Sequence, residues 1–281
     1  MQKVLINGQW RDASSSSSFQ AHNPATCEAL PDEYPVSDWN DCDAALAAAE
    51  SAAATMASLP ATAVADFLDR YAEGIEQHSE AIVSLANLET ALPSSPRLAD
   101  IELPRTTGQL RSAAAAAREG SWAMPTFDTA SGIRSMYGPI GPVAIFGPNN
   151  FPLAFGSISG GDFAAAVAAG NPVIAKANSS HPGTTRLFAE QAQLAAEETG
   201  MPDGTVQLIY RTGHADGERL VADPRNGATA YTGSRGAGLK LKAAADAAGK
   251  PIYLELSSVN PMILLPGALE ERSEDIAEEL A

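Results

Sequence analysis

Residues 143–176 read VAIFGPNNFPLAFGSISGGDFAAAVAAGNPVIAK. An apolar run at 143–146, a polar turn and an alanine-rich stretch lead to a second apolar run at 173–175. The alternation continues with apolar runs at 206–210, 228–232 and 252–256, each of the first two followed by a helical stretch. Short apolar runs that alternate with helical stretches are typical of βαβ units, whose parallel strands are covered by helices. The stretch therefore predicts an α/β fold with a Rossmann-type parallel sheet and helices on both faces.

A helical region is expected before this sheet. Residues 40–56 are alanine-rich and follow an Asn/Asp capping signal, and apolar residues recur at three- and four-residue spacing over 62–92. After a break at Pro93-Ser-Ser-Pro96, a further helix is predicted over 106–118. The serine tract at 14–18 is expected to be a surface loop between two short extended pieces.

Glycine and proline interrupt short extended runs between residues 122 and 142, which predicts a β-hairpin outside the core. This hairpin is a candidate assembly element.

Composition narrows the possible partners. The 281 residues contain 34 acidic and 18 basic side chains, and the resulting charge of −16 argues against nucleic acid or an anionic membrane surface as partner. The two cysteines, Cys27 and Cys42, are too few for a disulfide framework or a zinc cluster, so no metal site is expected and a reducing compartment is favoured. No stretch has the length of a membrane span, and a cytoplasmic protein is predicted.

Ligands bind at the carboxyl ends of the strands in such sheets, so the residues after each run are candidates for function. Asn150 follows the first run, where its amide could donate to an oxyanion or could cap the next helix. Lys176 follows the second run, where its ammonium could reach ribose hydroxyls or a phosphate, although a solvated surface lysine is the commoner case.

The fourth run leads into Thr232-Gly-Ser-Arg-Gly-Ala-Gly238, which places glycines and a hydroxyl at a helix start. Backbone N–H groups there can bind a pyrophosphate, although the sequence lacks a G-x-G-x-x-G fingerprint. The fifth run places Glu255 in an apolar strand, where desolvation would raise its pKa toward that of a general base. The alternative is a buried Glu paired with a basic residue.

In order and spacing, these residues resemble the aldehyde dehydrogenase superfamily from Val4 to the last residue. Asn23-Pro-Ala-Thr26 resembles the early N-P-A-T-G motif, and Gly233-Ser234 with Gly238 resembles the G-S-x-x-x-G pyrophosphate turn. More narrowly, the segments beginning at Asn150, Gly160, His181, Thr232 and Ser257 resemble the α-ketoglutarate semialdehyde (2,5-dioxopentanoate) dehydrogenase branch.

The resemblance implies oxidation of an aldehyde to a carboxylic acid with NADP or NAD. It implies an NAD(P)-binding domain formed by residues 1–122 and 142–258, an oligomerisation hairpin at 123–141 and the start of a truncated catalytic domain at 259–281. The implied catalytic residues are Asn150 as oxyanion donor and Glu255 as general base. The implied cofactor-binding residues are Lys176, Ser179, Gly213, Gly233, Ser234 and Gly238. Because Ser179 stands where NAD-preferring relatives often have an acidic residue, NADP is expected to bind at least as readily as NAD.

Three departures from the family pattern affect these expectations. Cys27 replaces the glycine after Asn-Pro-Ala-Thr and is expected to be a turn residue, and Ser257 and Ser258 replace two glycines. The family's nucleophilic cysteine, expected about thirty residues or more beyond Glu255, is not among the 26 residues that follow it, so this chain alone is expected to be inactive.

The expected partners are an aldehyde and, at full length, further copies of the chain. The alternatives left open are an inactive cofactor-binding fragment and another semialdehyde or thioester-forming enzyme of the same superfamily.

Overall fold

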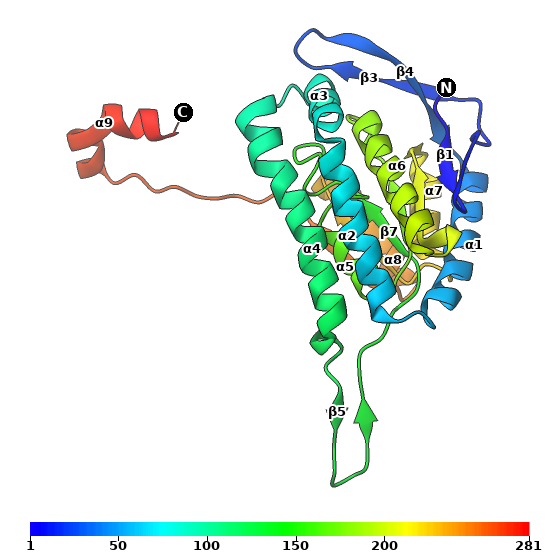
Figure 1. Ribbon diagram of the computed structural model, residues 1–281. Helices are drawn as coiled ribbons and strands as arrows, with labels where there is room; N and C mark the ends of the chain where they lie inside the picture. The colour runs from blue at the N-terminus through cyan, green and yellow to red at the C-terminus, as the bar shows by residue number, and fades with distance from the viewer. Residues whose placement is uncertain (281) are drawn as a thin grey trace.

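The centre of the structure, a computed structural model that describes residues 1–280, is a mostly parallel β-sheet (Figure 1). Within these residues the sheet contains seven strands in the order β12-β11-β7-β8-β9-β1-β2. Its mutually parallel strands are β7 (Val143–Phe146), β8 (Val173–Lys176), β9 (Val206–Ile209), β11 (Ala228–Thr232) and β12 (Ile252–Glu255). All five apolar runs are strands, as predicted, and each strand end lies within one residue of its predicted place.

Helices cover both faces of the sheet (Figure 1). On one face lie α5 (Gly161–Ala168) and α6 (Pro182–Thr199), with α2 (Ala61–Gln77) and α4 (Leu103–Glu119) packed against them. On the other face lie α1 (Trp39–Met56), α7 (His214–Ala222) and α8 (Arg235–Ala247). Strands β7 and β9 are buried along their whole length because both of their faces meet a helical layer. The predicted fold class is confirmed.

The helical region before the sheet differs from the prediction in its boundaries. The stretch predicted as helical over 62–92 contains two helices, α2 and α3 (Ser79–Thr90), separated at His78. The break was not visible because buried Ile75 and Ile82 keep the seven-residue spacing of a continuous helix. A π-helical segment, η1 (Ser94–Glu102), precedes α4, which begins at Leu103 rather than at the predicted residue 106.

The first four strands belong to two different sheets. β1 (Val4–Ile6) pairs antiparallel with β9 and with β2 (Gln9–Arg11), and so extends the main sheet. β3 (Ser18–Asn23) and β4 (Glu28–Ser37) form a second sheet with β10 (Arg211–Thr212). Cys27 lies in the turn between β3 and β4 with a φ of 61°, a conformation that glycine adopts without strain. This agrees with its interpretation as a turn residue at a position where the family has glycine.

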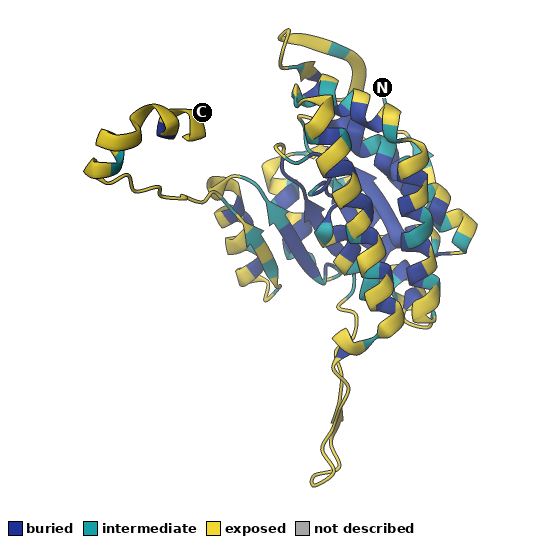
Figure 2. Ribbon diagram, turned by 60° about the vertical axis from the view of Figure 1, so that its left-hand side comes forward, coloured by how far each residue is buried: buried dark blue, intermediate teal, exposed yellow. Residues whose placement is uncertain are grey.

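Two segments extend away from the body (Figure 2). The 3₁₀ turn η2 (Ser121–Ala123) leads from α4 into a hairpin of β5 (Thr126–Phe127) and β6 (Arg134–Ser135). After β12 an exposed segment leads to α9 (Pro266–Leu280). None of the helices within residues 1–280 combines the length and the apolar character that crossing a bilayer requires.

Candidate cofactor cleft and active site

A cleft of about 410 Å³ opens between α7 and α8 at the carboxyl ends of the strands. The ends of β7, β8 and β11 contribute Phe146, Lys176 and Tyr231 to its lining, and the two helices supply further residues, including His214, Gly217 and Leu241. The volume lies within the range of small-molecule sites. The cleft is therefore the place where this sheet is expected to bind a ligand.

Lys176 is the last residue of β8 and projects into this cleft. Burial of the ammonium, and secondly the charge of Arg211, lower the pKa of Lys176 to about 8. Within residues 1–280 no side chain forms a hydrogen bond or an ion pair with its Nζ. Ser179 and Gly213 line the same cleft, so the structure brings together three of the predicted cofactor-binding residues.

Of the other three predicted cofactor residues, Gly233 and Ser234 lie in the turn from β11 into α8, and Gly238 lies within α8. Ser234 holds the N-cap position of α8, and no side chain of the described chain caps the first N–H groups of this helix. These groups can donate to an anion. A Cβ atom at Gly238 would lie 2.5 Å from Leu256 Cδ2 and 3.1 Å from Tyr231 Cε1. Glycine at 238 thus allows close packing of α8 on the sheet, whereas Gly233 and Ser234 shape the turn itself.

Asn150 lies in the loop between β7 and α5, and its side chain is exposed. The N-cap of α5 is Gly160, ten residues later, so the structure excludes the alternative that Asn150 caps the next helix. Instead the loop is held from η1, the segment before α4: Arg97 Nη2 donates to the backbone oxygen of Asn150 over 3.0 Å. The amide of Asn150 remains available as a donor.

A buried carboxylate, which sequence reasoning missed, anchors the same loop. Glu102 is fully buried, and its Oε2 accepts from the backbone N–H groups of Leu153 at 2.9 Å and Ala154 at 3.2 Å. Its Oε1 lies 2.9 Å from Arg97 Nη2. Burial nevertheless raises the pKa of Glu102, against the opposing effects of these hydrogen bonds and of Arg97. An acidic residue between Ile101 and Leu103 was the only sequence signal for this anchor.

The expectation that Glu255 is desolvated was wrong for the described chain. β12 is an edge strand of the sheet, and the Glu255 side chain is exposed at its end. Glu255 lines a separate pocket of about 280 Å³ together with Arg105, Phe155 and Asp162. Burial, and secondly the charge of Glu255, raise the pKa of Asp162. Asn150 is not among the residues that line this pocket.

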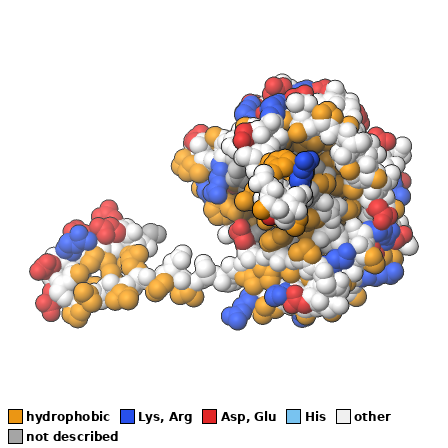
Figure 3. Space-filling view, turned by 90° about the horizontal axis from the view of Figure 1, so that it is seen from below, with side chains coloured by type: hydrophobic (Ala, Val, Ile, Leu, Met, Phe, Trp, Pro, Cys, Tyr) orange, Lys and Arg blue, Asp and Glu red, His pale blue; other side chains and the backbone are white. Residues whose placement is uncertain are grey.

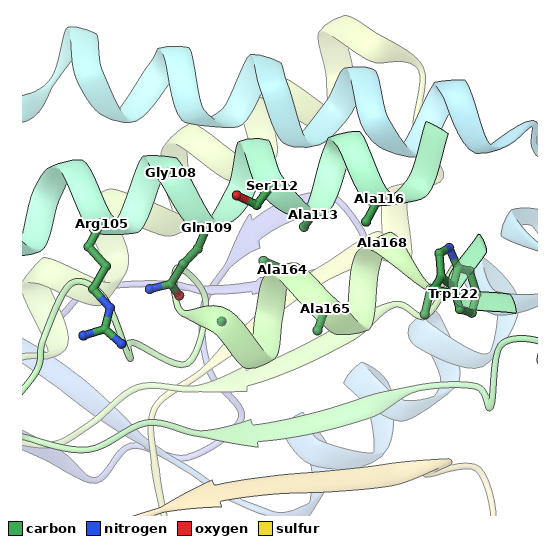
Figure 4. Close-up of a pocket in the computed structure, with 12 residues that line it drawn as sticks. Arg105, Gly108, Gln109, Ser112, Ala113, Ala116, Trp122, Ala164, Ala165 and Ala168 are labelled. Atoms are coloured by element: carbon green, nitrogen blue, oxygen red, sulfur yellow. The ribbon is translucent and has the colours of Figure 1, made fainter. Parts of the chain in front are cut away.

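A longer groove of about 740 Å³ runs between α4 and α5 (Figure 4). Small side chains such as Ala113 and Ala164 form its walls, with Arg105 and Gln109 near one end and Trp122 at the other. Arg105 and Gln109 also line the Glu255 pocket, so the pocket and the groove adjoin. Sequence reasoning found the alanine run but did not predict a groove.

Comparisons with known proteins agree with this architecture. Residues 10–278 match the aldehyde dehydrogenase family. The chain is 38% identical over 285 residues to alpha-ketoglutaric semialdehyde dehydrogenase 2 of Azospirillum brasilense, covering 97% of this chain and 54% of that protein. It is 36% identical over 288 residues to the alpha-ketoglutaric semialdehyde dehydrogenase of Acinetobacter baylyi, covering 99% and 54%.

A solved structure of aldehyde dehydrogenase C from Pseudomonas syringae, a cysteine-to-alanine variant with NAD+ and octanal, matches with a TM-score of 0.80. The identity is 25%, over 94% of this chain and 52% of that one. This chain spans about half the length of the curated relatives that it matches. The resemblance found in the motifs, including that to the α-ketoglutarate semialdehyde branch, is confirmed, and the chain belongs to the aldehyde dehydrogenase family.

Proposed function

We propose that this chain provides the cofactor cleft, the oxyanion donor and the general base of an NAD(P)-dependent dehydrogenase that oxidises α-ketoglutarate semialdehyde to α-ketoglutarate. The observation that carries the proposal is the cleft at the strand ends, where Lys176 has no anionic partner within residues 1–280. The two α-ketoglutaric semialdehyde dehydrogenases among the relatives support the choice of substrate.

The residues of the cleft suit a dinucleotide. The ammonium of Lys176 and the hydroxyl of Ser179 can bind ribose hydroxyls or a phosphate on it, and Gly213 borders the same space. The first N–H groups of α8, with Gly233 and Ser234 in the turn before it, can receive the pyrophosphate, and Gly238 lets α8 lie close to the sheet. A bound nicotinamide would supply the hydride acceptor.

In the proposed reaction a cysteine thiolate attacks the aldehyde carbon, and Asn150 donates its amide N–H to the resulting oxyanion. After loss of hydride, Glu255 takes a proton from the water that hydrolyses the thioester, which releases the acid and the thiol. Neither cysteine of this chain suits the nucleophilic role. Cys27 lies in the β3–β4 turn, and burial raises the pKa of Cys42 to about 12.

Two measurements on the chain itself test the proposal. Titration of NADPH fluorescence should show binding. An assay for aldehyde oxidation should show none, because neither Cys27 nor Cys42 suits the nucleophilic role. Turnover that depended on a thiol of this chain, or that persisted in a Cys27→Ser/Cys42→Ser double variant, would contradict the proposed mechanism.

The role of Asn150 is tested in an enzyme that joins this chain to the remaining half of an aldehyde dehydrogenase. Asn150→Ala should lower kcat on the order of a hundred-fold, as loss of one oxyanion donor does, and should leave cofactor affinity nearly unchanged. Asn149→Ala is the matched control, since Asn149 is also exposed and has no proposed chemical role. Equal losses of kcat at both positions would refute the assignment.

We also propose the domain division given by the resemblance: NAD(P) binding by residues 1–122 and 142–258, assembly by 123–141, and the start of a catalytic domain at 259–281. Supporting the assembly role, Phe127, Ile133 and Met136 of the hairpin are each more than 60% exposed. Figure 3 views the molecule from the end at which this hairpin projects, and hydrophobic side chains are prominent on that face. Exposed apolar patches of this kind mark interaction surfaces, and a second copy of the chain is the proposed partner.

Sedimentation velocity tests the assembly proposal. Replacing Ile133 and Met136 by serine should shift an oligomer to the monomer. A sedimentation distribution that did not change in the variant would show that the hairpin is not part of the interface.

A further inference from the structure

The loop between β7 and α5, which carries Asn150, contains no regular helix or strand of its own. Side chains of more distant segments hold its backbone instead. From the segment after β8, Asn178 Nδ2 donates to the backbone oxygen of Gly147 over 3.0 Å. From η1 the contacts come from Arg97 and Glu102. The position of the Asn150 amide therefore depends on side chains outside the loop.

A single guanidinium, that of Arg97, makes three contacts around Asn150. Its Nη2 donates to the backbone oxygen of Asn150 over 3.0 Å and lies 2.9 Å from Oε1 of Glu102. Its Cζ lies 4.0 Å from the ring centroid of Phe151, the residue that follows Asn150, in the geometry of a cation–π contact. The peptide that joins Asn150 to Phe151 is thus held both at its oxygen and through the next side chain.

Arg97 also compensates the charge of the carboxylate that holds the next part of the loop. Oε2 of the fully buried Glu102 accepts from two backbone N–H groups of the loop, at Leu153 and Ala154. Its Oε1 has no well-aligned hydrogen bond within residues 1–280 and is held by the charge of Arg97, with a smaller effect from Arg105. A buried carboxylate that loses its cation is costly. Loss of Arg97 should therefore loosen the loop at both of its attachments to η1.

We infer that Arg97 is a positioning residue for the oxyanion donor: its contacts with the loop and with Glu102 fix the direction in which the Asn150 amide points. The inference rests on the proposed role of Asn150 and adds the residue that maintains it. Because the Asn150 side chain is exposed and makes no hydrogen bond within residues 1–280, its backbone contacts are what orient it. A donor to an oxyanion must be preorganised, and a displacement of about 1 Å can cost on the order of a hundred-fold in rate.

Hydrogen exchange in the 281-residue chain tests these contacts without turnover. Amide exchange is followed by mass spectrometry in peptides that cover residues 147–156. Arg97→Gln should raise the exchange rate there at least tenfold, and Arg97→Lys, which keeps the charge beside Glu102, should raise it less. Arg111→Gln is the matched control, because Arg111 of α4 also pairs with a glutamate, Glu76, but donates to no atom of the loop. It should change the exchange rate of these peptides less than twofold. Equal exchange in Arg97→Gln and the unmodified chain would overturn the inference.

A double-mutant cycle tests the role of Arg97 in the chemistry, in the enzyme that joins this chain to the remaining half of an aldehyde dehydrogenase. Arg97→Gln should lower kcat at least tenfold, while the KM for the aldehyde and the affinity for NADPH change less than twofold. In an Asn150→Ala background the same substitution should lower kcat less than twofold, because the donor that Arg97 positions is gone. Equal losses of kcat in both backgrounds would show a general structural role and overturn the inference.

The same cycle separates the inference from the proposed function. If Asn150→Ala lowered kcat and Arg97→Gln did not, the inference would fail and the proposed function would stand. If Asn150→Ala left kcat unchanged, the assignment of the oxyanion donor would fail and the inference with it. Arg97→Lys should recover part of the kcat that Arg97→Gln loses, since an ammonium keeps the charge but not the planar fork of N–H groups.

Discussion

Replacing Gly238 by alanine is expected to make the protein about 2 kcal/mol less stable than the same replacement at Gly236. Both glycines lie in α8, two residues apart, so both substitutions should gain the same helix propensity, about 0.5–1 kcal/mol. Their surroundings differ. A Cβ atom at Gly236 would meet nothing within 4 Å, whereas at Gly238 it would lie 2.5 Å from Leu256 Cδ2.

The magnitude follows from the displacement that the new methyl group requires. Ordinary contacts begin at 3.4 Å, so Leu256 Cδ2 must give way by 0.9 Å, the difference between 3.4 and 2.5 Å. The ring of Tyr231, 3.1 Å from the same Cβ position, limits movement of the helix in the other direction. Overpacking of this kind costs about 1–3 kcal/mol, and the flexible end of Leu256 places the expected cost near the middle of that range.

Urea unfolding followed by far-UV circular dichroism measures the difference. Gly236→Ala should raise the free energy of unfolding by about 0.5–1 kcal/mol, and Gly238→Ala should lower it by about 1 kcal/mol, with equal m-values. If the two alanine variants agreed within about 0.5 kcal/mol, α8 would not pack on the sheet as closely as described. The requirement for glycine at 238 would then have to come from the ligand.

Three further measurements concern titratable groups. Because burial lowers the pKa of Lys176 to about 8, NADPH affinity should fall as the pH rises through 8, and Lys176→Met should remove this dependence in a fluorescence titration. Glu89 is a buried residue near the end of α3, and burial raises its pKa to about 7, so between pH 4.5 and 7 the folded state holds a proton that the unfolded state has lost. The free energy of unfolding of the protein should therefore decrease as the pH rises through this window. Urea titrations of Glu89→Gln should show a free energy of unfolding that depends less on pH. Because burial raises the pKa of Cys42 to about 12, a thiol reagent should label only Cys27 in the native chain, and Cys27→Ser should abolish this labelling.

The strands of the main sheet were predictable because each is short, apolar and covered on both faces. Along β7 every residue is buried, so the run stands out without any knowledge of its neighbours. The place of β1 in this sheet was not predictable in the same way. Its pairing with β9 joins Leu5 to Leu208, and nothing local to either segment specifies a partner about 200 residues away.

The residues of the candidate site also differ in whether local sequence could predict them. Lys176 and Ser179 could be predicted because position after a strand is a local property of the sequence. The anchors of the Asn150 loop could not, since Glu102 reaches the backbone of Leu153 from 51 residues away. Arg211, which lines the same cleft as Lys176, was missed for a related reason: its place beside Lys176 depends on the order of the strands in the sheet.

The error about Glu255 has a physical cause that concerns the whole site. The apolar run that contains Glu255 resembles a central strand in sequence, but β12 lies at the edge of the sheet, where every second residue is open to solvent. A carboxylate there is hydrated, and desolvation would require another segment to cover the edge.

The adjoining groove between α4 and α5 is open as well, and Arg105 and Gln109 connect it to the Glu255 pocket. In the proposed enzyme, a segment that covers this edge and groove would bring the thiol to Asn150 and would also shield Glu255 from bulk solvent. The cofactor cleft lies elsewhere, between α7 and α8. In the proposed enzyme, cofactor binding and chemistry would take place in different parts of the molecule, so NADPH binding can be tested without turnover.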